Sequence, residues 1–184
     1  MTSIADPVVG SPGSALCTEC GLCCTGALHN FAVLDPDEID FARSIGLTLR
    51  IEGRPGFALP CPHLNQSTCT IYADRPKVCA RYKCGLLERL EAGSTSFDAA
   101  LATVAGAKEL VDRAQSAMPD GMTIPAARAL SNEPPTTGVN AGERTSEMRL
   151  RLAMMALNLF LDKHFKNDRE GKQLSFETIA NSQP

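Results

Sequence analysis

The stretch that decides the fold runs from position 17 to position 24 and reads Cys17-Thr-Glu-Cys20-Gly-Leu-Cys23-Cys24. Four more cysteines follow at Cys61, Cys69, Cys79 and Cys84, and the 100 residues after position 84 contain none. Thiolate sulfur is the ligand that Zn(II) and iron–sulfur clusters prefer, and either site needs about four thiolates. The eight cysteines are therefore candidate metal ligands, and the expected cofactor is an iron–sulfur cluster, which we favour, or Zn(II).

The spacing of the first four cysteines leaves the ligand sets open. Cys-x2-Cys-Gly resembles a zinc knuckle, whereas Cys-x2-Cys-x2-Cys matches the first three ligands of a bacterial ferredoxin run. That spacing predicts that Cys17, Cys20 and Cys23 bind one centre. Neighbouring side chains rarely chelate one ion, so Cys23 and Cys24 face two sites or one of them is a core thiol. Eight cysteines could fill two sites or include some that are not ligands.

Composition and charge exclude several classes of protein. The 184 residues carry a net charge of −3, which argues against general nucleic-acid binding through a basic surface. No apolar run approaches the roughly 20 residues of a membrane span, and residues 1–14 do not resemble a secretory signal. We therefore expect a cytoplasmic protein with neither nucleic-acid nor membrane partners. Because the cytosol keeps thiols reduced, metal binding is favoured over a disulfide framework.

The fold class that the pattern predicts is mainly α with a small irregular or short β part. A cysteine-rich, metal-organised N-terminal half would pack on a C-terminal helical bundle. The predicted divisions of the chain are a flexible arm at 1–14, a cysteine-cluster metal-binding module at 15–92, a helical region at 93–170 and a tail at 171–184. A Pro- and Gly-containing loop interrupts the helical region at about 131–142.

Local signals predict several elements within the cysteine module. Asp35-Pro36 is typical of a helix start, and that helix should run to about residue 44. Residues 47–59 predict a short strand followed by a turn at Pro55-Gly56, and residues 61–71 predict a loop with a turn at Asn65-Gln66-Ser67. A helix over 74–91 would carry both Cys79 and Cys84, about 140° apart around its axis. Those two thiols could reach one site only if the helix ends or distorts near Cys84.

The same stretch contains an excess of positive charge. Five cationic side chains stand between positions 75 and 89 against a single acid, Glu88. A buried four-thiolate site carries net negative charge and requires compensation, so these cations support a metal site nearby. The alternative is an ordinary solvated helix face.

Helical periodicity dominates the C-terminal half. Apolar residues recur in steps of three and four from Phe97 to Met118, and a shorter helix is expected from Ile124 to Leu130. The predicted long helix Glu143–Lys166 has an apolar stripe wide enough to cover two faces. It could be the central helix of a bundle, or it could bind a protein partner or form a homodimer.

All eight cysteines carry a family resemblance. The run at 17–24, the sequence Cys61-Pro-His-Leu and the segment 69–84 with its Ile71-Tyr72-x2-Arg75-Pro76 element resemble the CxxCxxCC cysteine-cluster family. These YkgJ-type proteins are described as zinc- or iron-chelating, and the module is similar to part of flagellin N-methylase. The resemblance covers about positions 17–90 and implies a metal or iron–sulfur module.

Three functions remain open from the sequence. The first is a metal-binding protein with a structural or redox role, serving a partner enzyme. The second is a metal- or iron–sulfur-dependent enzyme that modifies protein side chains, such as a flagellin N-methylase-like lysine methylase, although no nucleotide-binding loop is present. The third is a thiol oxidoreductase, because Cys-x-x-Cys has redox spacing, although no thioredoxin-like pattern accompanies it.

Other side chains near the cysteines receive simpler interpretations. His63 follows Cys61 closely, but a packing or surface role is favoured over metal ligation. His29 and His164 are isolated in the sequence and are interpreted as ordinary residues. Tyr72 and Tyr82 flank cysteines and are expected to form an apolar shell that limits solvent access.

Overall fold

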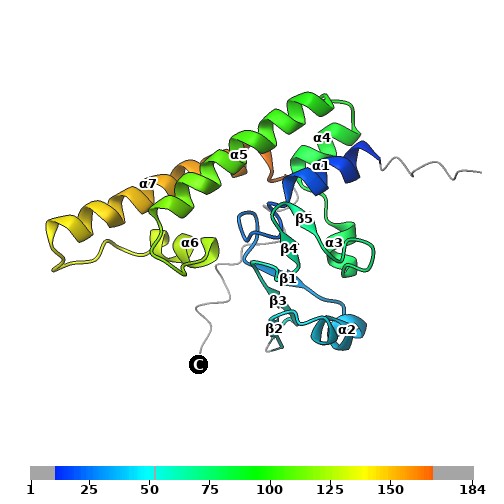
Figure 1. The fold of residues 1–184 in the computed structure, drawn as a ribbon, viewed down its shortest axis with the longest axis horizontal. Helices are drawn as coiled ribbons and strands as arrows, with labels where there is room; N and C mark the ends of the chain where they lie inside the picture. The colour runs from blue at the N-terminus through cyan, green and yellow to red at the C-terminus, as the bar shows by residue number, and fades with distance from the viewer. Residues whose placement is uncertain (1–10, 52, 168–184) are drawn as a thin grey trace, which may run out of the picture.

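The computed structural model describes residues 11–51 and 53–167 of the chain. The first ten residues of the expected arm and the whole expected tail at 171–184 lie outside the described residues. Two units are visible in Figure 1: a group of long helices, and a smaller part made of short strands and short helices. The mainly α fold with a small β part is confirmed.

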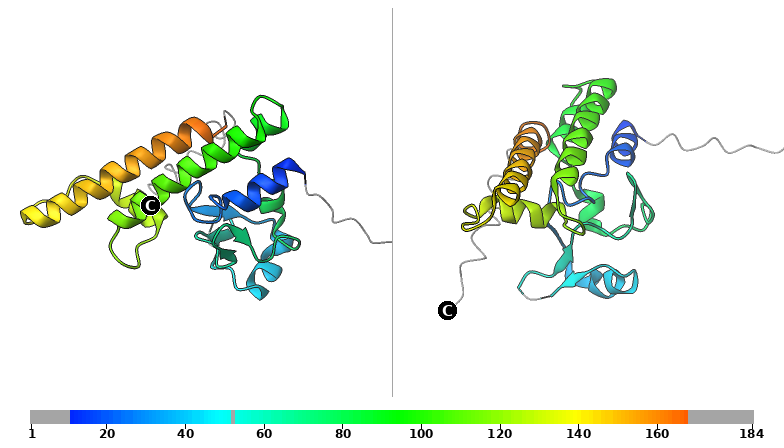
Figure 2. Two further views of the ribbon diagram at one scale, coloured as in Figure 1. Left: turned by 45° about the horizontal axis from the view of Figure 1, so that its top comes forward. Right: turned by 60° about the vertical axis from the view of Figure 1, so that its left-hand side comes forward.

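The helical unit is built on two long helices that lie side by side and run in opposite directions (Figure 2). They are α5 (Phe97–Ala117) and α7 (Ala141–His164), and α6 (Ile124–Asn132) packs against α7. The predicted stripe on α5 is confirmed, since the buried residues of this helix are Ala100, Val104, Ala107, Val111 and Ala114. Small side chains at three of these positions let α7 approach closely. Together these elements hold most of what we call the large core.

Helix α7 buries one face and exposes another. The buried face carries Leu150, Met154, Leu157 and Leu161. A second apolar row is 50–63% exposed and consists of Met148, Leu152, Met155 and Leu159. The expectation that this helix buries two faces is therefore wrong for the single chain, because these four side chains remain at least half exposed. A partner or homodimer at that row stays a prediction.

The β part consists of two small antiparallel sheets. One has the order β1 (Phe31–Val33), β3 (Gly56–Ala58), β2 (Leu49–Arg50), and the other pairs β4 (Leu64–Asn65) with β5 (Thr68–Cys69). A 3-10 turn, η1 (Pro36–Glu38), leads into α2 (Ile39–Ser44), as Asp35-Pro36 predicted. This helix and the first sheet enclose the small core, which is made of Leu34, Ala42, Leu47 and Phe57.

Three remaining helices flank the cysteines: α1 (Pro12–Cys20), α3 (Lys77–Arg81) and α4 (Gly85–Glu91). Helix α1 packs on both α4 and α5, which attaches the start of the cysteine module to the helical unit. Because α1 begins at Pro12, residues 12–14 are helical although we expected them in the flexible arm. No helix in the described part of the chain is long and apolar enough to span a bilayer.

Polar contacts from the helical unit also hold the cysteine module in place. Arg128 of α6 donates hydrogen bonds to the carbonyl oxygens of Gly26 and Ala27. The Lys108 ammonium of α5 donates to the carbonyl of Glu19 and, at 2.7 Å, to Ser67 Oγ. Since both cations satisfy oxygens that no helix or strand satisfies, they fix the segment that carries the first four cysteines.

Candidate metal centre

Helix α1 presents the first cysteines in its last turn. The Ser11 hydroxyl accepts a hydrogen bond from the Ser14 backbone N–H, and proline occupies the first helical position. Gly21 ends the helix in the left-handed conformation, with φ of 67°, and a Cβ there would lie 2.9 Å from the Ser67 carbonyl oxygen. The chain therefore turns sharply after Cys20 and brings Cys23 and Cys24 against the segment at 61–69.

The predicted single helix over 74–91 is wrong, because the chain is extended between α3 and α4. Tyr82, which follows α3, has a ψ of 130°. Cys84 is the N-cap of α4, and its Sγ accepts a hydrogen bond from the Leu87 backbone N–H at 3.5 Å. The break separates Cys79, on α3, from Cys84. The helix ends before Cys84, so the fixed angle between two positions of one helix does not restrict which site its thiol joins.

A hairpin and one backbone hydrogen bond position the middle cysteines. The Cys61 N–H donates to the Cys24 carbonyl oxygen at 2.8 Å, so these two residues lie side by side. Cys69 pairs with Leu64 across the β4–β5 hairpin, whose turn contains Gln66 at a φ of 54°. The turn that the sequence predicted at 65–67 is thus confirmed, but it closes two short strands instead of lying in a loop.

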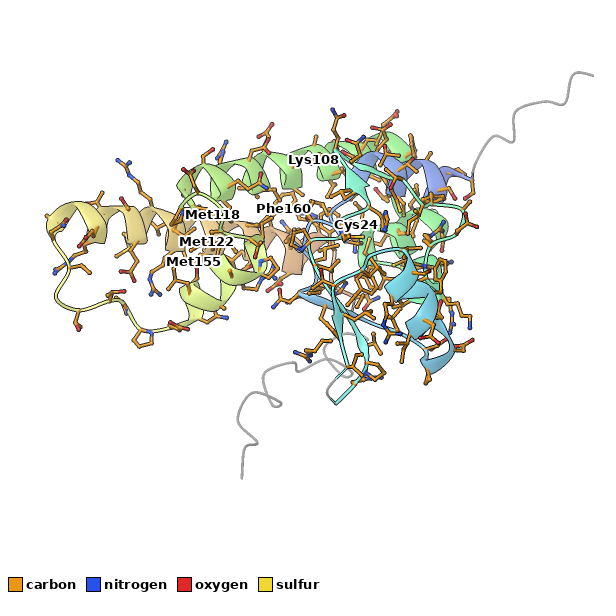
Figure 3. The ribbon with its side chains drawn as sticks, turned by 60° about the horizontal axis from the view of Figure 1, so that its bottom comes forward. Cys24, Lys108, Met118, Met122, Met155 and Phe160 are labelled. Atoms are coloured by element: carbon orange, nitrogen blue, oxygen red, sulfur yellow. The ribbon has the colours of Figure 1, made fainter. Side chains whose placement is uncertain are left out.

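All eight cysteines line one cavity of about 420 Å³ where the helical unit meets the β part. Cys24 lies at this junction in Figure 3, and Lys108 lies across from it on α5. In residues 11–51 and 53–167, no three Cys, His, Asp or Glu side chains are gathered tightly enough to hold a single metal ion as they stand. The thiols therefore surround a space larger than one ion needs.

Burial makes these thiols weaker acids than an ordinary cysteine. It raises the pKa of Cys20 and of Cys24 to about 12 and that of Cys79 to about 11. Burial also raises the pKa of Cys23 well above 9.0, and the nearby thiol of Cys84 raises it further. Without a cation these groups stay protonated at neutral pH, so a metal or cluster must displace their protons when it binds.

Only part of the expected positive charge faces the cysteines. Lys77 and Arg81 form ion pairs with Asp37 and Asp35, at 2.5 and 2.7 Å. Lys83 pairs with Glu91, and Arg89 donates to the carbonyl oxygen of His164. These four cations therefore have oxygen partners of their own, although Lys83 also lines the cavity, and compensation of a metal site by the whole stretch stays a prediction.

Two cations, Arg75 and Lys108, favour the charged form of nearby thiols. The positive charge of Arg75 opposes the rise in pKa of both Cys17 and Cys79, and its guanidinium stacks on the Tyr72 ring at 3.7 Å. The positive charge of Lys108 likewise opposes the rise in the pKa of Cys20. Sequence reasoning missed Lys108, because nothing in its own helix distinguishes it from a solvent-facing lysine.

The histidines and tyrosines fit the packing interpretation in most respects. His63 Nε2 is 2.7 Å from the Ile45 carbonyl oxygen, which accounts for that ring without a metal. Tyr72 and Tyr82 line the cavity, as expected for a shell around the thiols. His29 also lines it and contacts the Tyr82 ring edge-on at 4.7 Å, so it belongs to this shell although the sequence did not indicate it.

Comparison with known proteins agrees with this site. The family model named CxxCxxCC, described as a "putative zinc- or iron-chelating domain", matches residues 16–98. Those residues contain all eight cysteines and end in the first turn of α5. This match agrees with the resemblance that the cysteine pattern indicated. No curated protein and no solved structure matched the chain.

Proposed function

We propose that the cysteine module binds an iron–sulfur cluster in preference to zinc, and that the cluster has a structural or redox role. The observation that carries this proposal is the single cavity of about 420 Å³ lined by all eight cysteines. In a tetrahedral zinc site with Zn–S bonds near 2.3 Å, the sulfurs lie about 3.8 Å apart. In a cluster the cysteines bind different irons, so a wider ring of thiols suits it better.

The surroundings of the thiols support the same proposal. Cys20, Cys84, Cys61 and Cys79 all pack against apolar cores, which keeps water away from the site. Arg75 and Lys108 place positive charge beside the sulfurs, where a thiolate-bound cluster would carry negative charge. A shielded cluster with nearby cations is suited to holding the fold together or to accepting an electron, and the hydrogen bonds and charges around it would set its potential.

Metal content after anaerobic preparation tests the proposal. The full-length protein would be purified without oxygen, and a second portion would be reconstituted with ferrous iron and sulfide. We expect brown protein with equal amounts of iron and acid-labile sulfide, and an EPR signal after reduction. Colourless protein that binds zinc tightly and no sulfide would reject the iron–sulfur assignment. Protein that binds neither would reject metal binding altogether.

A further inference from the structure

We propose that the eight cysteines form two separate centres of four thiols each. The helix-end group is Cys17, Cys20, Cys23 and Cys84, and the sheet group is Cys24, Cys61, Cys69 and Cys79. This inference rests on the proposed function and adds the ligand sets, which neither the cysteine spacing nor the family description assigns.

The helix-end group is brought together by the ends of two packed helices. Cys17 and Cys20 occupy the last turn of α1, and Cys84 caps the N-terminus of α4, which packs on α1. Cys20 and Cys84 both pack against the large core. Cys23 lies in the turn that follows Gly21, directly after α1, and lines the cavity with the other three.

The sheet group is brought together by the β part. Cys61 donates its N–H to the Cys24 carbonyl, and Leu64, which pairs with Cys69, donates its own N–H to the Cys61 carbonyl at 3.2 Å. Cys61 and Cys79 both pack against the small core. Burial is the main cause of the raised pKa of Cys24, and the neighbouring thiols that raise it further are those of Cys61, Cys79 and Cys69. Each group is thus supported by its own core and its own backbone contacts.

The boundary between the two groups falls on the peptide bond from Cys23 to Cys24. Cys23 follows the Gly21 turn at the end of α1, whereas the Cys24 carbonyl oxygen accepts the N–H of Cys61 in the β part. Four cysteines complete a cubane cluster, whose thiols do not have to converge on one ion, so the division into four and four leaves no ligand over. The shared peptide would hold the two centres close together.

The test compares serine variants from the two groups. Cys84→Ser is a mild change, because a serine hydroxyl is a favoured N-cap and preserves the start of α4. Its counterpart is Cys69→Ser in the hairpin, and Cys17→Ser and Cys61→Ser repeat the comparison within each group. All proteins are reconstituted anaerobically with ferrous iron and sulfide, and in parallel with Zn(II) alone. Far-UV circular dichroism confirms that the long helices remain.

Two centres predict about eight irons per wild-type chain, or about two zinc ions. Each single variant should retain about half of the wild-type content, and the double variant Cys69→Ser/Cys84→Ser should retain none. With iron–sulfur, the reduced wild type should show EPR broadening from magnetic coupling between the clusters, and each single variant should lose it. If every single variant loses all bound metal, or the wild type binds one centre, the two-centre proposal is overturned while the proposed function stands. A wild type that binds no metal overturns both.

Discussion

Removing the bound group should unfold the β part of the cysteine module and leave the long helices folded. The perturbation is a strong chelator with reductant present, so that no disulfide replaces the metal. The segment at risk is 31–83, because its own apolar support is the small core alone. Residues of α1 and α4 contact the large core and should be affected less.

A comparison of the free energies involved predicts that the segment unfolds when the metal is removed. Leu34, Leu47 and Phe57 are the large side chains of the small core, and burying each contributes about 1.5–3 kcal/mol, or about 5–9 kcal/mol together. Ordering the backbone and side chains costs about 1.5 kcal/mol per residue. The burial of three large side chains therefore offsets this cost for only a few residues of the segment. A structural metal site contributes about 10–16 kcal/mol of binding free energy, so the metal is the larger stabilising contribution here.

Hydrogen–deuterium exchange read by mass spectrometry distinguishes the two regions. After stripping, peptides from 31–83 should exchange as an unfolded chain does, while peptides from α5 and α7 stay protected. Protein treated with reductant alone serves as the control, and reloading the metal should restore protection. If the metal-free, reduced protein keeps full protection over 31–83, the bound group is not structural and the thiols must be explained by redox chemistry or packing.

Three further predictions use matched changes. Met154→Ala should lower the free energy of unfolding by about 2–5 kcal/mol, because Met154 is fully buried, whereas Met155→Ala, 55% exposed, should stay within about 0.5 kcal/mol in chemical denaturation. Arg75→Gln should make the cluster's reduction potential more negative in a redox titration, since it removes a positive charge beside the thiols. Gly26→Ala should lower the melting temperature more than Gly93→Ala: both have a positive φ, of 83° and 70°, but only at Gly26 would the new Cβ meet a proline of α6, at 2.8 Å.

Much of the helical unit could be predicted because its signals are local and periodic. The buried positions of α5 follow steps of three and four, and the start of the η1–α2 segment follows from Asp35-Pro36. The wide apolar stripe of α7 was also predicted, but the sequence could not show which part of it the chain itself buries. Periodicity shows which faces of a helix are apolar, and only the packed structure shows that Met154 is buried while Met155 is exposed.

The sequence at the start of α1 contains a local signal for a helix start, but the composition of the segment led to a different prediction. Ser11 followed by Pro12 is a helix start, yet the richness of this segment in Ser, Pro and Gly favoured a flexible arm. The break between α3 and α4 had no comparable signal. The Gly85 N–H donates to the Phe165 carbonyl oxygen at 2.7 Å, so it is unavailable for a bond one turn back in a continuous helix. A Cβ at Gly85 would also lie 2.6 Å from the Lys166 carbonyl oxygen.

The break between α3 and α4 determines the position of the Cys84 thiol. On one helix Cys79 and Cys84 would rise only about 1.5 Å per residue and remain neighbours. With residues 82–84 extended, the chain advances about 3.3 Å per residue and carries Cys84 by about 10 Å, away from the hairpin and toward α1. There α4, which begins after Cys84, packs on α1, which carries Cys17 and Cys20, while Cys79 on α3 packs against the small core with Cys61. The proposed ligand sets thus depend on a contact with the C-terminal end of α7, about 80 residues away in the chain, which no spacing rule within the cysteine module could supply.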